Sequence, residues 1–183
     1  MRAFIGIDFD ESTKDEIKAL QHHYRNRALK GRWKHRDNFH ITLKFLREVD
    51  PGQKKQIDAI LEDICGKQEP FTLELTEPQI FKGRDSIRVL WLGVSGDLAR
   101  LHSLQSEIEL ALEPIGFEKE NRKYNPHITI GQDILLDDSF ERIRESIPAV
   151  HFKPMRVKDI YLFKSEQIDN KRIYTKVSRY DLP

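Results

Sequence analysis

Two tetrapeptides, His-Ile-Thr-Leu at 40–43 and His-Ile-Thr-Ile at 127–130, each place an imidazole two residues before a hydroxyl. Successive side chains of a β-strand point to opposite faces, so on a strand each histidine would share a face with its threonine. Imidazole titrates near neutral pH, and of two facing histidines one can accept a proton while the other donates one. Threonine hydroxyls can donate hydrogen bonds to phosphoryl oxygens. The pattern therefore indicates acid–base catalysis of an in-line displacement at phosphorus.

The residues that alternate with each motif predict which face is buried. In the first copy the core face is expected to hold Phe39, Ile41, Leu43 and Phe45. The opposite face is expected to hold His40, Thr42 and Lys44. In the second copy Ile128 and Ile130 are expected to point inward, and His127, Thr129 and Gly131 outward. An apolar face would thus fix each strand while the imidazole and the hydroxyl project together.

A purely structural role or a metal site would account for the motifs less well. One copy alone would be better explained as a polar pair on an edge strand, but two copies after matching helices favour a shared site. A metal site is not supported, because His-Glu-x-x-His and paired cysteines are both absent. His22 and His23 are adjacent on a predicted helix and point apart. We therefore expect no metal and no other cofactor.

The elements that position the motifs follow from periodicity and capping signals. Strands are predicted at 2–9, within 32–49 with a turn at Asp37–Asn38, at 70–81, at 86–95 and at 126–134. A C-terminal hairpin is predicted from 155–167 and 172–182 around the sequence Ile-Asp-Asn-Lys. Helices are predicted from the Asp10–Thr13 region to about residue 28, at 50–66, from Asp97 to about 115, and at 138–147.

This order contains an internal duplication. A strand, a helix and the first histidine strand are followed by a second strand, helix and histidine strand, and each half continues with a helix and a strand. No low-complexity linker separates the halves, so residues 1–183 are expected to form a single domain made of two similar halves. Pseudo-twofold packing would bring the two histidine strands face to face across a cleft.

Composition limits the class of protein. The chain of 183 residues has 38% hydrophobic and 33% charged residues and a formal net charge of +1, as ordinary globular proteins do. Cys65 is the single cysteine, which excludes an intramolecular disulfide and favours a reducing setting. The apolar run before Asp8 is too short for a signal peptide, and none approaches the ~20 residues that cross a bilayer. A cytoplasmic protein without membrane contact is expected, and nothing indicates a second subunit.

A local basic segment borders the first motif. Residues 25–36 contain six lysines and arginines, no acid, and Trp33. Cations with an interleaved aromatic suit single-stranded nucleic acid, so Arg32, Trp33 and Lys34 are candidate RNA contacts. Tyr124, three residues before His127, is a second candidate for stacking on a base. A solvated helix end and loop, with Trp33 in the core, explains the segment equally well.

The paired motifs resemble those of the two-histidine (2H) phosphoesterases. One branch, the LigT-like RNA 2′,3′-cyclic phosphodiesterases, is also similar over nearly the whole chain, as follows: MRAFIGIDF, RWKHRDNFHITLKFL, VLWLGV, YNPHITIG and the terminal LFKSE…YTKVSRYDL. The usual glycine after KFL is Arg47 here, which questions the following turn rather than the chemistry.

The resemblance implies a fold and a reaction. The fold is α+β and bilobal, with two antiparallel sheets around a central groove. The reaction is metal-free hydrolysis of a terminal 2′,3′-cyclic phosphate on RNA to a 2′-phosphomonoester. His40 would donate the proton to the departing O3′, His127 would accept the proton of water, and Thr42 and Thr129 would bind the phosphate. Two alternatives stay open: a 2′–5′ RNA ligase, and a non-catalytic module that binds RNA ends or nucleotides.

Overall fold

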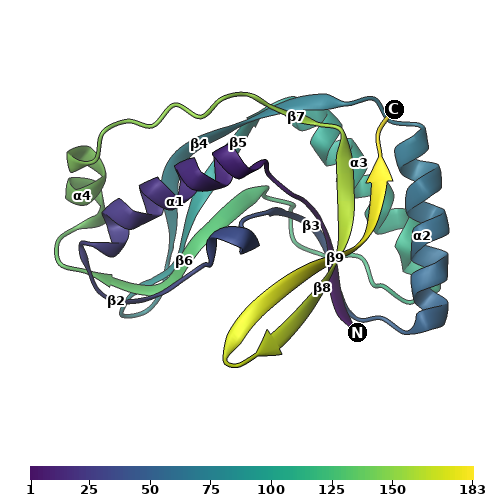
Figure 1. Ribbon diagram of the computed structural model, residues 1–183, viewed down its shortest axis with the longest axis horizontal. Coiled ribbons are helices and arrows are strands. Elements are labelled where there is room, and N and C mark those ends of the chain that lie inside the picture. The colour runs from purple at the N-terminus through teal and green to yellow at the C-terminus, as the bar shows by residue number, and fades with distance from the viewer.

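Two antiparallel sheets carry the two histidine motifs, one motif on each sheet. The structure, a computed structural model, describes residues 1–183 (Figure 1). The first sheet has the strand order β3-β1-β8-β9 and the second the order β2-β6-β5-β4-β7. The strands are β1 (Arg2–Ile7), β2 (Ala28–Trp33), β3 (Ile41–Glu48), β4 (Phe71–Lys82), β5 (Ile87–Gly96), β6 (His127–Leu136), β7 (Met155–Val157), β8 (Asp159–Ile168) and β9 (Lys171–Asp181). The predicted α+β fold with two antiparallel sheets is confirmed.

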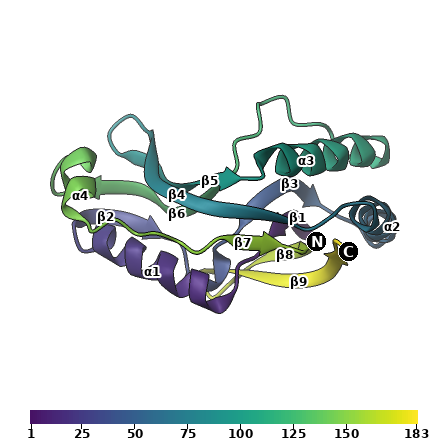
Figure 2. The same ribbon diagram turned by 90° about the horizontal axis from the view of Figure 1, so that it is seen from above.

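Four α-helices flank these sheets: α1 (Glu11–Arg25), α2 (Pro51–Gly66), α3 (Leu98–Leu112) and α4 (Phe140–Ser146). Short 3-10 turns lie at η1 (Arg36–Asn38) and η2 (Glu113–Ile115). Figures 1 and 2 show α1 and α4 beside the second sheet, α2 and α3 toward the other end, and the β8–β9 hairpin reaching away from the body.

Three of the four helices begin at side-chain caps. Asp10 and Asp50 accept hydrogen bonds from the backbone N–H three residues on, as does Ser139. Asp97 precedes α3 without capping it, because its carboxylate accepts instead from the backbone N–H of Thr72 at 2.9 Å.

The duplication is visible in the strand order. Each sheet contains a histidine strand, then the opening strand of the same half, then a third strand: β3-β1-β8 in one sheet and β6-β5-β4 in the other. The third strand of each trio comes from the opposite half of the chain. The two halves therefore exchange a strand, and each sheet needs both halves.

The first helix is shorter than predicted. It ends at Arg25 rather than near residue 28, and β2 begins at Ala28 and pairs with β6. The side chain of Arg27 binds the Asp137 carboxylate, and the N–H of Asp137 donates to the carbonyl of Arg27 at 2.8 Å. Pairing with β6 thus outweighs the helical propensity of Ala28, Leu29 and Lys30.

The predicted faces of β3 are wrong after Leu43. Two register shifts against β1 leave one extra residue in β3 at Leu43 and another at Leu46. Such β-bulges move the following side chains to the other face of the sheet. Lys44, expected beside the motif, is therefore paired with Ile5 and buried, and Phe45, expected in the core, is 71% exposed.

The C-terminal hairpin forms, but the segment before it is split between the two sheets. The short strand β7 pairs with β4, and β8 pairs with β1 and β9. Asp169 and Asn170 make the turn with positive φ angles of 47° and 61°, which short polar residues tolerate. A change of sheet at Lys158 leaves no mark in the periodicity of the sequence.

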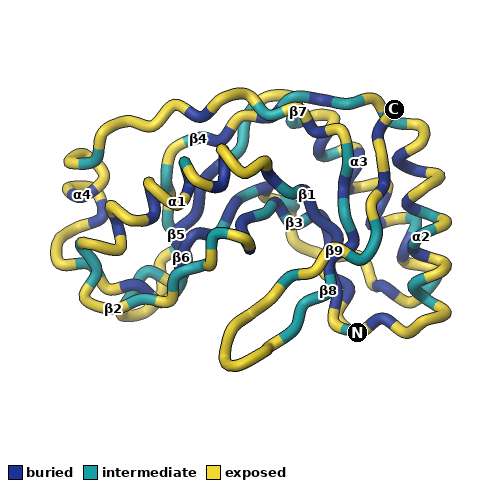
Figure 3. Tube along the Cα trace, viewed as in Figure 1, coloured by how far each residue is buried: buried dark blue, intermediate teal, exposed yellow.

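One core joins both sheets. A continuous cluster of 37 buried residues includes side chains from both halves, and Figure 3 shows buried positions along the central strands and the inner sides of the helices. The alternation in the second motif is correct for Ile128 and Ile130, which are fully buried. Gly131 is buried as well, because the rings of Trp33 and the side chain of Ile134 lie over it. None of the helices is both long and apolar enough to cross a membrane.

Candidate active site

The first histidine is held by its own strand entry. His40 Nδ1 lies 2.7 Å from the carbonyl oxygen of Asn38, and Nε2 lies 2.9 Å from Thr42 Oγ1. A carbonyl oxygen can only accept, so Nδ1 must carry the hydrogen. In the neutral imidazole Nε2 therefore holds the lone pair and accepts from the Thr42 hydroxyl. The predicted pairing of His40 with Thr42 on one face is present.

The second histidine repeats this anchor. His127 Nδ1 lies 2.7 Å from the carbonyl oxygen of Asn125, again two residues before the histidine. Its Nε2 is thus the nitrogen left for a substrate, whereas Nε2 of His40 is bonded to the Thr42 hydroxyl. Thr129 is half-buried two residues later on β6 and pairs with Trp91 of β5. The duplicated motif therefore repeats the Nδ1 anchor, whereas the bond between Nε2 and a threonine is present in the first copy.

The two motifs lie next to each other across the sheets. Strands β3 and β6 are in contact, and the charge of His127 is close enough to lower the pKa of His40. Tyr124 joins the two motifs directly, since its hydroxyl donates to the carbonyl of Thr42 at 2.8 Å. Tyr124 precedes Asn125, whose carbonyl anchors His127.

Each imidazole stands beside a separate group of aromatic rings. The ring of His40 lies 4.6 Å from Phe4 and 5.3 Å, edge-on, from Tyr174. The ring of His127 lies 5.7 Å from Trp91 and 5.8 Å from Phe81. Phe4 and Trp91 occupy the opening strands β1 and β5, so this feature also follows the duplication.

The charge state of free His40 is neutral. Its pKa is lowered from 6.5 to about 4, chiefly because burial disfavours the imidazolium. Charge interactions with Lys34 and His127 also lower the pKa of His40, whereas the bond to Asn38 and the charge of Asp8 raise it. A bound phosphate anion would act in the same direction as Asp8.

Charged side chains surround the His40 side of the site. The Asp8 carboxylate is 10% exposed and binds Lys14 at 3.0 Å and Lys176 at 2.6 Å. Lys34 Nζ stands 5.7 Å over the ring of Tyr174. A hollow of about 390 Å³ opens here and is lined by Asp8, Glu11, Lys14, Asp37, Phe163, Tyr174, Thr175 and Lys176.

The residues predicted to contact RNA are dispersed. Lys34 lies beside the site, whereas the Arg32 guanidinium binds the carboxylate of Asp133. Trp33 is half-buried over Gly131, and Tyr124 is half-buried with its hydroxyl on Thr42. These two aromatic side chains therefore have structural partners.

Sequence reasoning missed the aromatic and acidic neighbours of the histidines. Phe4 and Trp91 lie on strands recognised only as apolar segments, and Asp8 directly follows the first of these strands. Tyr174 and Phe81 lie far from either motif in the sequence. Their proximity depends on strand pairing. The equivalent positions of Phe4-Ile5-Gly6 and Trp91-Leu92-Gly93 were the one available signal.

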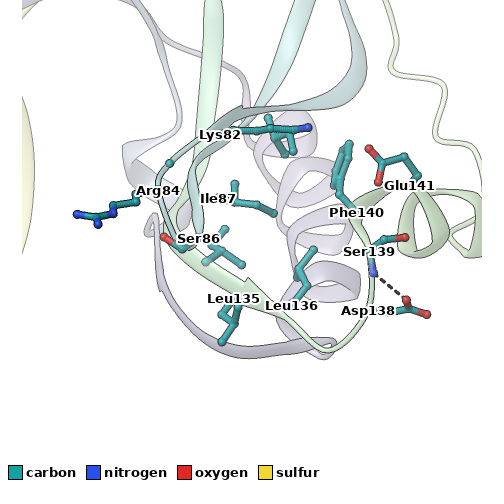
Figure 4. A pocket seen from close by; sticks show the side chains of 13 residues that line it. Lys82, Arg84, Ser86, Ile87, Leu135, Leu136, Asp138, Ser139, Phe140 and Glu141 are labelled. Atoms are coloured by element: carbon teal, nitrogen blue, oxygen red, sulfur yellow. Dashed lines mark hydrogen bonds between the residues drawn. The ribbon is translucent and has the colours of Figure 1, made fainter.

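The rest of the molecule offers no comparable centre. No group of three or more His, Cys, Asp or Glu side chains could hold a metal ion. A second hollow of about 360 Å³ lies between the β4–β5 turn and α4, where Lys82, Ile87, Leu136 and Phe140 surround it (Figure 4). It contains neither histidine motif.

Comparison with known proteins agrees with this geometry. The profile of the family described as LigT like Phosphoesterase matches residues 7–91 and, a second time, residues 92–174. The chain is a LigT-like phosphoesterase. The resemblance predicted from the sequence is thus confirmed, and the two successive matches agree with the exchanged halves of the fold.

Relatives of this LigT-like phosphoesterase span its full length. A protein of Methanocaldococcus jannaschii named RNA 2′,3′-cyclic phosphodiesterase is 32% identical over 98% of this chain and 100% of its own. One of Methanothermobacter thermautotrophicus with the same name is 28% identical over 100% and 99%. The crystal structure of E. coli LigT complexed with 3′-AMP has a TM-score of 0.82 and 28% identity, covering 99% of this chain and 97% of that one.

Proposed function

We propose that this LigT-like phosphoesterase hydrolyses terminal 2′,3′-cyclic phosphates of RNA to 2′-phosphomonoesters without a metal ion. The observation that carries the proposal is the pair of imidazoles, each anchored through Nδ1 to a backbone carbonyl at 2.7 Å. This anchor leaves each Nε2 as the nitrogen that can exchange a proton with substrate. The names of the full-length relatives support the same substrate.

In this mechanism His127 Nε2 accepts a proton from water as its oxygen attacks phosphorus. His40 Nε2–H donates a proton to O3′ as the P–O3′ bond breaks, and the 2′-phosphomonoester remains. The hydroxyls of Thr42 and Thr129 donate to the non-bridging oxygens, whose negative charge increases in the transition state. His40 is neutral in the free protein, so the substrate phosphate must raise its pKa before it can act as the acid.

Of the residues predicted to contact RNA, the proposal keeps Lys34 and limits the parts of Arg32 and Trp33. Lys34, whose Nζ lies over the ring of Tyr174 on the His40 side, would bind a backbone phosphate. Arg32 would have to leave Asp133 to do so, and Trp33 could offer only its exposed edge. We also infer a monomer working in the cytoplasm, where the buried free thiol of Cys65 would stay reduced.

The deciding experiment is an assay of a nucleoside 2′,3′-cyclic phosphate in the presence of EDTA, with the product identified as the 2′- or 3′-phosphate. Turnover to the 2′-phosphate is expected, and His40→Ala and His127→Ala should each lower kcat by about 10²–10⁴-fold. Activity that returns only with an added divalent cation would overturn the metal-free mechanism. Saturable binding without turnover would indicate a binding module.

The roles of the two histidines can be separated with an aryl phosphodiester whose leaving group needs no proton. On this substrate His40→Ala should recover most of its lost rate, because the acid is no longer required. His127→Ala should stay slow. The opposite result would exchange the two roles.

A further inference from the structure

A row of phenylalanines crosses the first sheet on the face that carries His40. Phe45 of β3 pairs in register with Phe4 of β1, and Phe4 pairs with Phe163 of β8. Residues paired across antiparallel strands project to the same face, and Gly6, two residues after Phe4, pairs with Thr42. Phe45 therefore lies on the same face as the first catalytic motif.

The three rings differ sharply in exposure. Phe4 is 2% and Phe163 is 5% exposed, whereas Phe45 is 71% exposed. β3 is the edge strand of its sheet, so no further strand covers Phe45. The core does not need this ring, because Leu43 and Leu46 on either side are buried.

The backbone is shaped to present this side chain. The bulges at Leu43 and Leu46 turn Lys44 to the core face, where it binds Glu109, and Phe45 to the opposite face. Arg47 then takes a φ of 59°, a left-handed conformation that is costly for a residue other than glycine. Arg47 is itself exposed.

The ring of Phe4 lies between Phe45 and the imidazole of His40. The ring of Phe4 lies 4.6 Å from His40 on one side and 6.2 Å from Phe45 on the other. A nucleic acid whose terminal phosphate sits at His40 would bring its neighbouring nucleotide near Phe45. A flat exposed ring at this position matches what a base needs for stacking.

We propose that Phe45 is a stacking subsite for the base of the nucleotide next to the cyclic-phosphate terminus. The proposal rests on the proposed phosphodiesterase activity and extends it, because it makes an oligonucleotide a better substrate than a mononucleotide. The ligand is thus a single-stranded RNA end of at least two nucleotides.

The test compares a trinucleotide ending in a 2′,3′-cyclic phosphate with the matching mononucleotide. Phe45→Ala should raise KM for the trinucleotide by about 5- to 100-fold, the range expected when one base–aromatic stack is lost, and leave the mononucleotide unchanged. Phe45→Trp should keep the preference for the trinucleotide. Thermal unfolding of each variant is measured alongside, so that a folding defect is recognised.

Leu110 provides the matched control. It is 57% exposed on α3, next to Glu109, and so lies on the far side of β3 from the histidine. Leu110→Ala should change neither KM. The stacking subsite would be overturned if Phe45→Ala raised KM equally for both substrates, raised it for the mononucleotide alone, or raised it for neither.

Failure of the proposed function would remain distinguishable. If the wild-type protein turned over neither substrate, fluorescence anisotropy of a labelled trinucleotide 2′-phosphate would still report binding. Weaker binding by Phe45→Ala, with Leu110→Ala unchanged, would support the subsite without the activity. Equal binding by all three proteins would contradict it.

Discussion

His40 must change its charge when substrate binds if it acts as the acid. Burial lowers its pKa to about 4 in the free protein, and a phosphate anion near Nε2 would stabilise the imidazolium. We expect NMR titration of His40 to give a pKa well below 6.5 without ligand and a higher pKa with a saturating nucleoside 2′-phosphate. A pKa unmoved by the ligand would favour His40 as the base.

The same low pKa makes a prediction for stability. Between pH 6.5 and about 4 the unfolded chain binds a proton at His40 that the folded chain does not, so stability falls as pH falls through this window. The loss from this one group is on the order of 3 kcal/mol at most. Chemical denaturation at about pH 7 and about pH 4.5 should show a smaller loss for His40→Gln than for the wild type.

At the scale of elements, the segment before β6 is hydrogen-bonded to β3. The Tyr124 hydroxyl donates to Thr42, and the buried Lys44 binds the Glu109 carboxylate at 2.6 Å and the carbonyl of Glu118 at 2.9 Å. This Tyr124 bond links Thr42 of the first motif to the residue before Asn125, whose carbonyl anchors His127. We therefore propose a positioning role for Tyr124, and the base stacking expected from the sequence stays a prediction.

Removing this hydroxyl should affect catalysis more than substrate binding. Tyr124→Phe is expected to lower kcat about 10-fold with little change in KM, because the distance between the two imidazoles is no longer fixed. Tyr180→Phe is the matched control, since the Tyr180 hydroxyl also makes one buried bond, to Asp58 at 2.6 Å, outside the site. Tyr124→Phe should lose about 1 kcal/mol of stability, and Tyr180→Phe about 1.5–3 kcal/mol because its hydroxyl donates to a carboxylate. Equal kcat values for Tyr124→Phe and Tyr180→Phe would contradict the positioning role of Tyr124.

The elements also show what the sequence could predict. Both histidine strands, the caps at Asp10 and Asp50 and the C-terminal hairpin follow from local signals. The bulges that reverse Lys44 and Phe45 do not, because a bulge is defined against the partner strand β1. The rings beside His40 and His127 were missed for the same reason: Tyr174 reaches His40 only through the pairing of β9 with β8.

At the scale of the whole molecule, the exchanged strands tie the halves together. The first sheet needs β8 and β9 from the second half, and the second sheet needs β2 and β4 from the first. We propose that residues 1–183 form one cooperative unit. Thermal unfolding should give a single transition by circular dichroism and by tryptophan fluorescence, since Trp33 and Trp91 report the second sheet.

Fragments test the same claim. The pieces 1–85 and 86–183, divided at the β4–β5 turn, should each be unfolded alone and should regain structure when mixed. Two separate transitions in the intact chain, or an independently folded fragment, would show that the halves are separate domains.

Both histidines are anchored through Nδ1 to a backbone carbonyl, and this has a consequence for the direction in which an RNA strand would bind. Two imidazoles anchored through Nδ1 in the same way cannot by themselves distinguish the two directions in which an RNA strand could bind. The distinction must come from what differs around them: Phe4 and Tyr174 beside one histidine, Trp91 and Phe81 beside the other. In the proposed RNA complex, the direction of the strand would therefore be set by the aromatic residues beside the two imidazoles and not by the imidazoles themselves.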